Sequence, residues 1–279
     1  MHATARHVVA AGTPLQSLKQ PMNAKLPLRP VTRRPLLVLL TLFTGLVVSC
    51  GDNPDAGDVT ITFHHTVADA PLVFNSVDYI NPAGETYNVT RLEYILTDAM
   101  LVRANGTSLD LQSAAYINAA DPSTTQWTKK VPGGQYSTLS FRFGVPAGTP
   151  FGDLPNSGNL NQMEWPAPMG GGYHYMRLEG LVEAGSEALL SHLGPSRGTD
   201  YSFVVDLPID LYVDGEPAQV PDQAPGSHLH VTMEVDQWWQ PNPYTFAGRG
   251  MIMGDADAQA LLSANGENVF SVVPISPGL

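Results

Sequence analysis

The sequence is poor in cysteine, in basic residues and in long apolar runs, and each shortage excludes a class of function. Cys50 is the only cysteine, so the chain can form neither a disulfide within itself nor a thiolate cluster for a metal. Eight basic and 26 acidic residues follow Cys50, which gives that part a net charge of −18 with histidine neutral. Such a charge repels nucleic acid and anionic membranes, so we expect the surface of the protein to bind neither of them.

The longest apolar run, residues 36–48, has 13 residues. It is shorter than the roughly 20 residues that a membrane-spanning helix needs. Four basic residues precede it between positions 25 and 34, and the small residue Ser49 follows it. A basic region, an apolar region and a small-residue cleavage site together indicate a secretory signal. The final Val-Val-Ser-Cys is similar to the bacterial lipobox, so we predict that Cys50 is lipidated and that this anchor is the only membrane contact.

Lipidation at Cys50 would divide the chain into three parts. These are an N-terminal extension with a lipoprotein signal peptide (1–49), a lipidated cysteine with a polar tether (50–58) and one β domain (59–279). Gly51 stands where many lipoproteins retained at the inner membrane have aspartate. By that analogy we expect a cell-envelope protein at the outer membrane, on its periplasmic or its surface side. Because the lipid would consume the only thiol, a metal must be held by nitrogen, oxygen or thioether ligands.

The sequence also lacks the motifs of common catalytic sites. There is no GxSxG, no HExxH, no GxxxxGK[ST] and no GxGxxG after a strand. Acidic residues are plentiful, and a hydrolase that uses an acidic pair stays the least favoured hypothesis. We therefore expect a binding protein and not an enzyme.

Short β-rich runs separated by proline and glycine indicate an all-β fold. We predict a single antiparallel domain, a β-sandwich or barrel-like fold with long loops. One helix is expected near the C-terminus over residues 255–265, with Asp255 or Asp257 as its N-cap. The loop 146–172 is long enough to carry function. The predicted strands are VTITFHHTV, YNVTRLEYILTDAMLV, QYSTLSFRFGV, GYHYMRLEGLV, DYSFVVDLPIDLYV and HLHVTMEVDQWW.

Six histidines follow Cys50, and strand alternation assigns faces to most of them. His65 shares a face with apolar neighbours and is predicted to point inward, whereas His64 points to solvent. His174 shares a face with Met176 and Leu178, so it also points inward. Each inward histidine is either hydrogen-bonded within the core or a metal ligand.

His228 and His230 form an HxH pair on one strand face. Their Cα atoms should lie roughly 6 to 7 Å apart, which permits two imidazoles to hold one metal. Their face is polar, so we predict a surface feature that is either a solvated strand or a metal site. His192 lies between an apolar stretch and a Gly/Pro loop, where the pattern does not orient it.

Several segments, taken in order, resemble one family. The strongest are GxYxxLxFxxGVP followed by GYxxxxLEG, and the match extends from about Val59 to Phe270. The chain is similar to the MbnP-like proteins, which are methanobactin-partner, copper-associated proteins of the periplasm or cell surface. The segments are FHHTV, YNVTRLEYILTDAMLV with NGTSLDL, VPGGQYSTLSFRFGVP, MEW, GYHYMRLEG, SHLG and NGENVF.

The resemblance implies an exported, mainly β-sheet protein that binds copper through histidine. The family's histidine after the first phenylalanine matches His65, and its His-Leu-Gly matches His192. Its Met-x-Trp matches Met163 and Trp165, which implies that Trp165 is oxidised to kynurenine by a dihaem peroxidase-like partner. His174 and the HxH pair remain candidates from strand alternation alone. Imidazole is a suitable copper ligand, so we predict copper acquisition, storage or transfer.

A second hypothesis comes from the aromatic residues. Trp238, Trp239 and Tyr244 are expected at the surface, where they would bind a glycan or a protein without catalysis. Binding that is insensitive to chelators would favour this alternative over copper.

Overall fold

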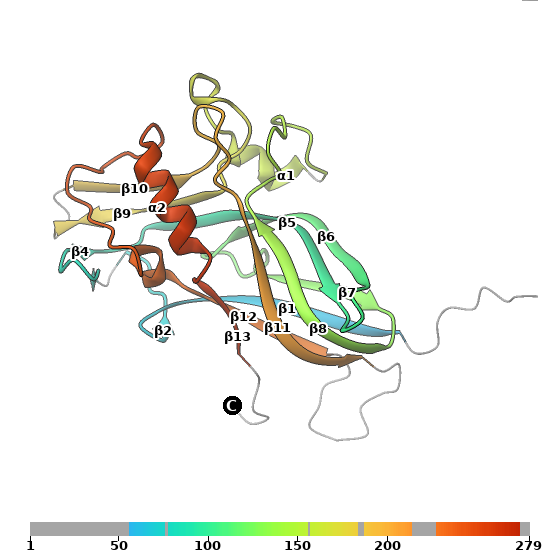
Figure 1. Ribbon diagram of the computed structural model, residues 1–279. Coiled ribbons are helices and arrows are strands. Elements are labelled where there is room, and N and C mark those ends of the chain that lie inside the picture. Colours follow the sequence, from blue (N-terminus) through green and yellow to red (C-terminus); the bar gives the residue numbers. More distant parts are fainter. Residues whose placement is uncertain (1–55, 76–77, 156, 184–186, 214–226, 274–279) are drawn as a thin grey trace, which may run out of the picture. The chain divides into compact units, whose positions relative to one another are not determined.

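The computed structural model describes residues 56–75, 78–155, 157–183, 187–213 and 227–273 (Figure 1). The predicted signal peptide, Cys50 and Gly51 lie outside these residues. The described part consists mainly of β-strands arranged in two sheets, with a few short helices. None of the helices in this part is long and apolar enough to cross a membrane.

The first sheet has five strands in the order β13-β12-β1-β2, with β7 paired to β1. The pair β1–β12 is parallel and sets Thr62 beside His230, whereas the other pairs are antiparallel. The expected purely antiparallel arrangement is therefore wrong at this one pair, because the chain passes through the second sheet between β1 and β12. The strand bounds are β1 Gly57–Val67, β2 Ala70–Pro71, β7 Gln126–Val131, β12 Ser227–Glu234 and β13 Phe270–Val273.

The second sheet has eight strands in the order β11-β8-β5-β9-β4-β3, with β10 paired to β9 and β6 paired to β5. Its pairs are antiparallel, and the register of β5 shifts next to Asp98. Asp98 has φ 54°, as expected at a bulge. The bounds are β3 Tyr79–Ile80, β4 Thr86–Tyr87, β5 Arg91–Val102, β6 Ser108–Asn118, β8 Gly134–Phe143, β9 Met176–Val182, β10 Glu187–Leu193 and β11 Phe203–Val213.

Aromatic side chains from both sheets meet in one core. Phe63 of β1 and Phe270 of β13 each contact Phe141 of β8, at ring-centroid distances of 6.1 and 5.2 Å. Two sheets that pack face to face through alternating apolar residues form a β-sandwich. The predicted all-β sandwich is thus confirmed.

The helices partly follow the sequence. Helix α2 (Ala256–Gly266) begins where predicted, and the Asp255 carboxylate accepts hydrogen bonds from the backbone N–H groups of Asp257 and Ala258. The expected strand through Trp239 is wrong beyond Glu234, where β12 ends and the 3-10 helix η4 (Val235–Trp239) begins. Adjacent strand residues point to opposite faces, so only a helical turn lets Trp238 and Trp239 both enter the core. The predicted long loop contains α1 (Ser157–Leu160), η1 (Asn161–Met163) and η2 (Ala167–Met169).

Candidate metal centre

His174 and His192 come together at the β9–β10 hairpin. Their ring centroids lie 5.0 Å apart, with an interplanar angle of 79°. His192 belongs to β10 and pairs with Arg177 of β9, while His174 lies just before β9. The N–H of Tyr175 donates to the carbonyl of Leu193 at 2.7 Å, which extends the hairpin ladder to the position of His174.

His174 is buried, as strand alternation predicted, with 7% of its surface exposed. Neither ring nitrogen makes a hydrogen bond of good geometry within the described residues, although the backbone carbonyls of Glu164 and Met163 lie close to the ring. The pKa of His174 falls to about 3, mainly because of burial; the nearby His192 and Arg177 also lower it, and the carbonyls of Glu164 and Met163 act in the opposite direction. The imidazole is therefore neutral at physiological pH and keeps a lone pair for a ligand.

His192 is fixed by a carboxylate. Its Nε2 lies 3.0 Å from Glu179 Oε1, while its Nδ1 is buried and has no partner in the described part of the chain. The hydrogen bond from His192 is the main reason that the pKa of Glu179 falls to about 2, with Arg91 and Arg177 adding to it against the effect of burial. An ionised Glu179 accepts a hydrogen bond from the Nε2–H group of His192. The nitrogen of His192 that keeps a lone pair is therefore Nδ1. Metal-bound histidines are commonly oriented by a carboxylate in this way.

The backbone of His192 is held from the C-terminal helix. Gln259 of α2 is fully buried, and its side-chain N–H donates to the His192 carbonyl at 2.6 Å and to the Ile252 carbonyl at 3.1 Å. Its side-chain oxygen accepts from the N–H of Gly194 at 3.1 Å. Figure 1 shows α2 beside β10. Neither Glu179 nor Gln259 carries a recognisable sequence signal, because both roles depend on the tertiary arrangement.

Trp165 packs against His174. Its ring centroid lies 4.8 Å from that of His174, and its side chain is fully buried. The indole N–H donates to the carbonyl of Met169 at 3.3 Å. Gly194 allows this close packing, since a Cβ there would lie 2.5 Å from the indole ring. Met163 is also buried, and its carbonyl accepts from the N–H of His174 at 2.6 Å.

His65 lies elsewhere. It is partly buried on β1, and its Nε2 lies 3.0 Å from the hydroxyl of Tyr94. No hydrogen bond, ion pair or ring contact within the described residues joins His65 to His174 or His192. The structure therefore brings together His174, His192 and Trp165, and the role of His65 as a ligand stays a prediction.

The HxH pair lies on the outer face of the first sheet, as predicted, with His228 exposed and His230 partly so. His64 of β1 is exposed and joins them there: its Nε2 lies 2.7 Å from His230 Nδ1. Across the described ranges, no group of three or more His, Cys, Asp or Glu side chains is arranged so that it could hold a metal as it stands. The buried pair, His174 and His192, and the surface cluster, His64, His228 and His230, each have fewer than three side chains aligned for a metal.

The aromatic residues proposed as an exposed binding surface are buried. Trp238 and Trp239 have no exposed surface, and Tyr244 is 1% exposed. Trp239 packs against Tyr244 at 5.3 Å and against Phe246 at 4.9 Å between ring centroids. The expectation that these three side chains face solvent is therefore wrong, because η4 turns both tryptophans inward.

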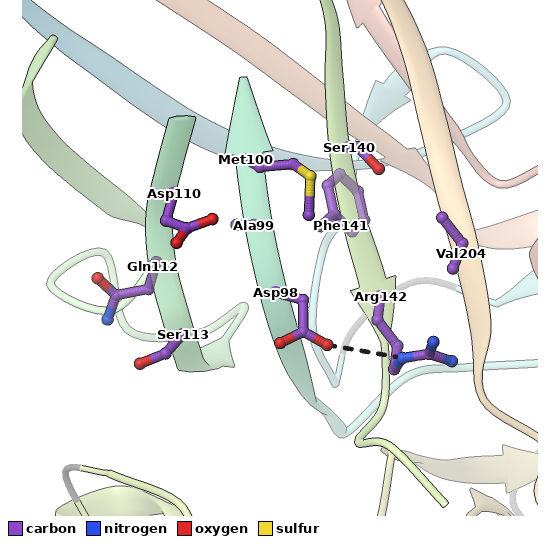
Figure 2. A pocket seen from close by; sticks show the side chains of 10 residues that line it. All are labelled: Asp98, Ala99, Met100, Asp110, Gln112, Ser113, Ser140, Phe141, Arg142 and Val204. Carbon is purple, nitrogen blue, oxygen red and sulfur yellow. Dashed lines mark ion pairs between the residues drawn. The ribbon is translucent and has the colours of Figure 1, made fainter. Parts of the chain in front are cut away.

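Two hollows in the described part of the chain are lined by residues other than the candidate histidines. Figure 2 shows one of about 380 Å³ on the second sheet, where Asp98 Oδ2 lies 3.8 Å from Arg142 Nε. The residues that line it come from β5, β6, β8 and β11 and include no histidine. Another, also of about 380 Å³, lies between the loops at 145–150, 170–172 and 195–200. Neither hollow contains a candidate ligand of the metal centre.

The fold and the site define an all-β protein with a buried two-histidine candidate metal centre beside a tryptophan. A model of the MbnP family matches residues 56–254, so the chain belongs to the MbnP family. Among solved structures, the chain is similar to MbnP from Methylosinus trichosporium, with 13% sequence identity and a TM-score of 0.48. That similarity covers 78% of this chain and 98% of the other. No curated protein matches the chain.

Proposed function

We propose that this chain is an exported copper-binding protein that holds copper between His174 and His192 and catalyses no reaction of its own. The observation that carries the proposal is that three buried ring nitrogens, both of His174 and the Nδ1 of His192, make no hydrogen bond of good geometry within the described residues, on two rings whose centroids lie 5.0 Å apart. Buried polar atoms without partners are uncommon and call for an explanation, such as an ion. The chain belongs to the MbnP family, and its resemblance to that family implies a role in copper binding. Family membership therefore supports an ion as the explanation.

The surroundings favour the lower oxidation state. Imidazoles bind a metal in their neutral form, His174 is buried, and Arg177 lies near enough to lower the pKa of His174. Transfer of an ion into such a site becomes more costly as its charge rises. Cu(I) is therefore better accommodated than Cu(II), and Glu179 balances its single positive charge through His192. Imidazole suits copper of either state.

The proposal is tested by anaerobic competition with a chromophoric Cu(I) chelator. We expect the parent protein to withdraw one equivalent of Cu(I) from the chelator. His192→Ala should lose this capacity, because only one imidazole would remain. His65→Ala should retain it, since His65 contacts neither proposed ligand. Parent-like binding by His192→Ala would refute the site, and loss of binding in His65→Ala would support the ligand set implied by the resemblance.

We further propose that Cys50 carries lipid and anchors the protein at the outer membrane, and that a dihaem peroxidase-like partner oxidises Trp165. The lipobox-like sequence supports the first proposal, and the contact of Trp165 with His174 supports the second. Intact-mass and peptide analysis of protein from its native envelope tests both. We expect a chain that begins at a lipidated Cys50 and a Trp165 peptide with the mass of a kynurenine. An unmodified cysteine or an unmodified tryptophan would contradict the respective proposal.

A further inference from the structure

Three histidines lie together on the outer face of the first sheet, apart from the proposed copper centre. His64 comes from β1, and His228 and His230 come from β12. The parallel register places His230 beside Thr62 and His228 beside Thr60, so His64 is one outward position further along β1 from Thr62. The outward positions alternate with buried residues on both strands. The cluster is therefore a feature of the solvent-facing side.

Two of these imidazoles already face each other through their nitrogens. His64 Nε2 and His230 Nδ1 are 2.7 Å apart, and the two rings lie edge to edge and nearly in one plane, with centroids 4.9 Å apart and an interplanar angle of 9°. The ring of His228 lies 6.4 Å from that of His230 between centroids, at an interplanar angle of 24°. Without a metal, a single shared proton holds the first two rings together.

This spacing is close to that of a chelate. Metal–nitrogen bonds of about 2.0 to 2.1 Å, set at angles between square-planar and tetrahedral values, place two ligand nitrogens about 2.9 to 3.4 Å apart. The present separation of 2.7 Å has to widen by only a few tenths of an ångström. Rotation of exposed side chains is sufficient for that movement, and the strands that carry them do not have to shift.

The neighbouring polar groups do not compete for the role of ligand. Thr60 and Thr128 bond to each other at 3.0 Å. Glu234, further along β12, accepts hydrogen bonds from the Thr66 hydroxyl at 2.6 Å and from the Asp69 N–H at 3.3 Å. The ligands of this cluster are therefore imidazoles alone, and water completes the coordination of an ion bound there.

We propose that His64 and His230 form a second, solvent-exposed site for a divalent transition-metal ion, with His228 as an additional ligand after side-chain rotation. Imidazole ligands with water suit Cu(II), Ni(II) and Zn(II), and affinity in this series is highest for Cu(II). The high-dielectric surroundings tolerate a double charge, in contrast to the buried centre. The two sites thus differ in the charge of the ion that they favour.

The test uses Cu(II) itself, titrated into the full chain and followed by electron paramagnetic resonance. We expect the parent protein to give a Cu(II) signal with nitrogen hyperfine structure. His64→Ala and His230→Ala should each weaken Cu(II) binding by at least about tenfold. Loss of a residue that only hydrogen-bonds to a metal ligand already lowers metal affinity by about 10-fold to 100-fold, and loss of the ligand itself should cost no less. Thr232→Ala, on the same face of β12, is the matched control and should bind like the parent.

A reciprocal experiment separates this proposal from the buried copper centre. His174→Leu should keep the Cu(II) signal, and His230→Ala should keep the uptake of one equivalent of Cu(I). Circular dichroism establishes that each variant is folded. An unchanged Cu(II) signal in folded His64→Ala and His230→Ala would overturn the second site, and so would its loss in His174→Leu. Loss of Cu(I) uptake alone in His174→Leu would leave both sites as proposed.

Discussion

Replacement of His174 by leucine is expected to abolish Cu(I) binding at the buried centre and, at the same time, to stabilise the metal-free protein. The affinity for Cu(I) should fall by more than about 100-fold. Removal of a residue that only hydrogen-bonds to a metal ligand lowers metal affinity by about 10-fold to 100-fold, and removal of the ligand itself should have a larger effect. The free energy of unfolding should rise by about 1 to 2 kcal/mol, since the variant no longer buries unpaired ring nitrogens. Chelator competition measures the first effect, and urea unfolding without metal measures the second.

His65→Leu is the matched control, and its expected change in the free energy of unfolding has the opposite sign. His65 pairs with the hydroxyl of Tyr94, whose side chain is fully buried. Removal of the imidazole leaves that hydroxyl without a partner and should lower the free energy of unfolding by about 1 to 3 kcal/mol. Cu(I) affinity should stay unchanged. If His174→Leu instead destabilised the metal-free protein as His65→Leu does, then His174 would be a structural core histidine and not a vacant ligand.

The second large effect is expected for Gly180→Ala in β9. A Cβ at Gly180 would lie 1.8 Å from the carbonyl oxygen of Asn88. That oxygen belongs to the backbone of a segment held by a hydrogen bond from the Asn88 N–H to the Leu181 carbonyl at 2.9 Å. The clash cannot be relieved by side-chain rotation, so we expect a loss of at least about 3 kcal/mol in unfolding free energy, measured by urea unfolding.

Gly250→Ala is the matched control, because a Cβ there would lie 3.6 Å from the nearest heavy atom, in ordinary contact. Its unfolding free energy should stay within about 0.5 kcal/mol of the parent value. Gly180 lies in β9 between Glu179 and Leu181, and Leu181 pairs with Ala188 of β10. The same substitution should therefore also disturb the β9–β10 hairpin and reduce Cu(I) uptake. A fully stable Gly180→Ala variant would contradict the packing of β9 against residues 88–89.

Strand alternation predicted part of the site correctly. It placed His174 inward and His64 outward, and both assignments are confirmed by their exposure. By the same alternation Tyr173 and Tyr175 should lie on the side opposite to His174, yet both of them are buried too. His174 lies before β9 begins, where Trp165 packs against its ring while Phe151 packs against Tyr173 and Gly144 lies against the ring of Tyr175. Local periodicity carries no information about these contacts.

Other features depend on contacts between distant parts of the chain. His192 could not be oriented because its strand, β10, was not recognised, and the bond to Glu179 follows from the hairpin register. The contact between His64 and His230 results from a parallel pairing of strands 166 residues apart. A single sequence contains both histidines but not their pairing.

Because of Gln259, the candidate metal centre depends on a residue that is synthesised after both of its histidines. The glutamine that holds the backbone of His192 lies 67 residues further along the chain, and it also lies beyond residue 254, where the family match ends. While that helix has yet to emerge from the ribosome, the side chain that holds the backbone of His192 is missing from the β9–β10 hairpin. The centre is therefore completed among the last parts of the domain, so that a chain cut short before α2 would carry both histidines without the clamp that positions them.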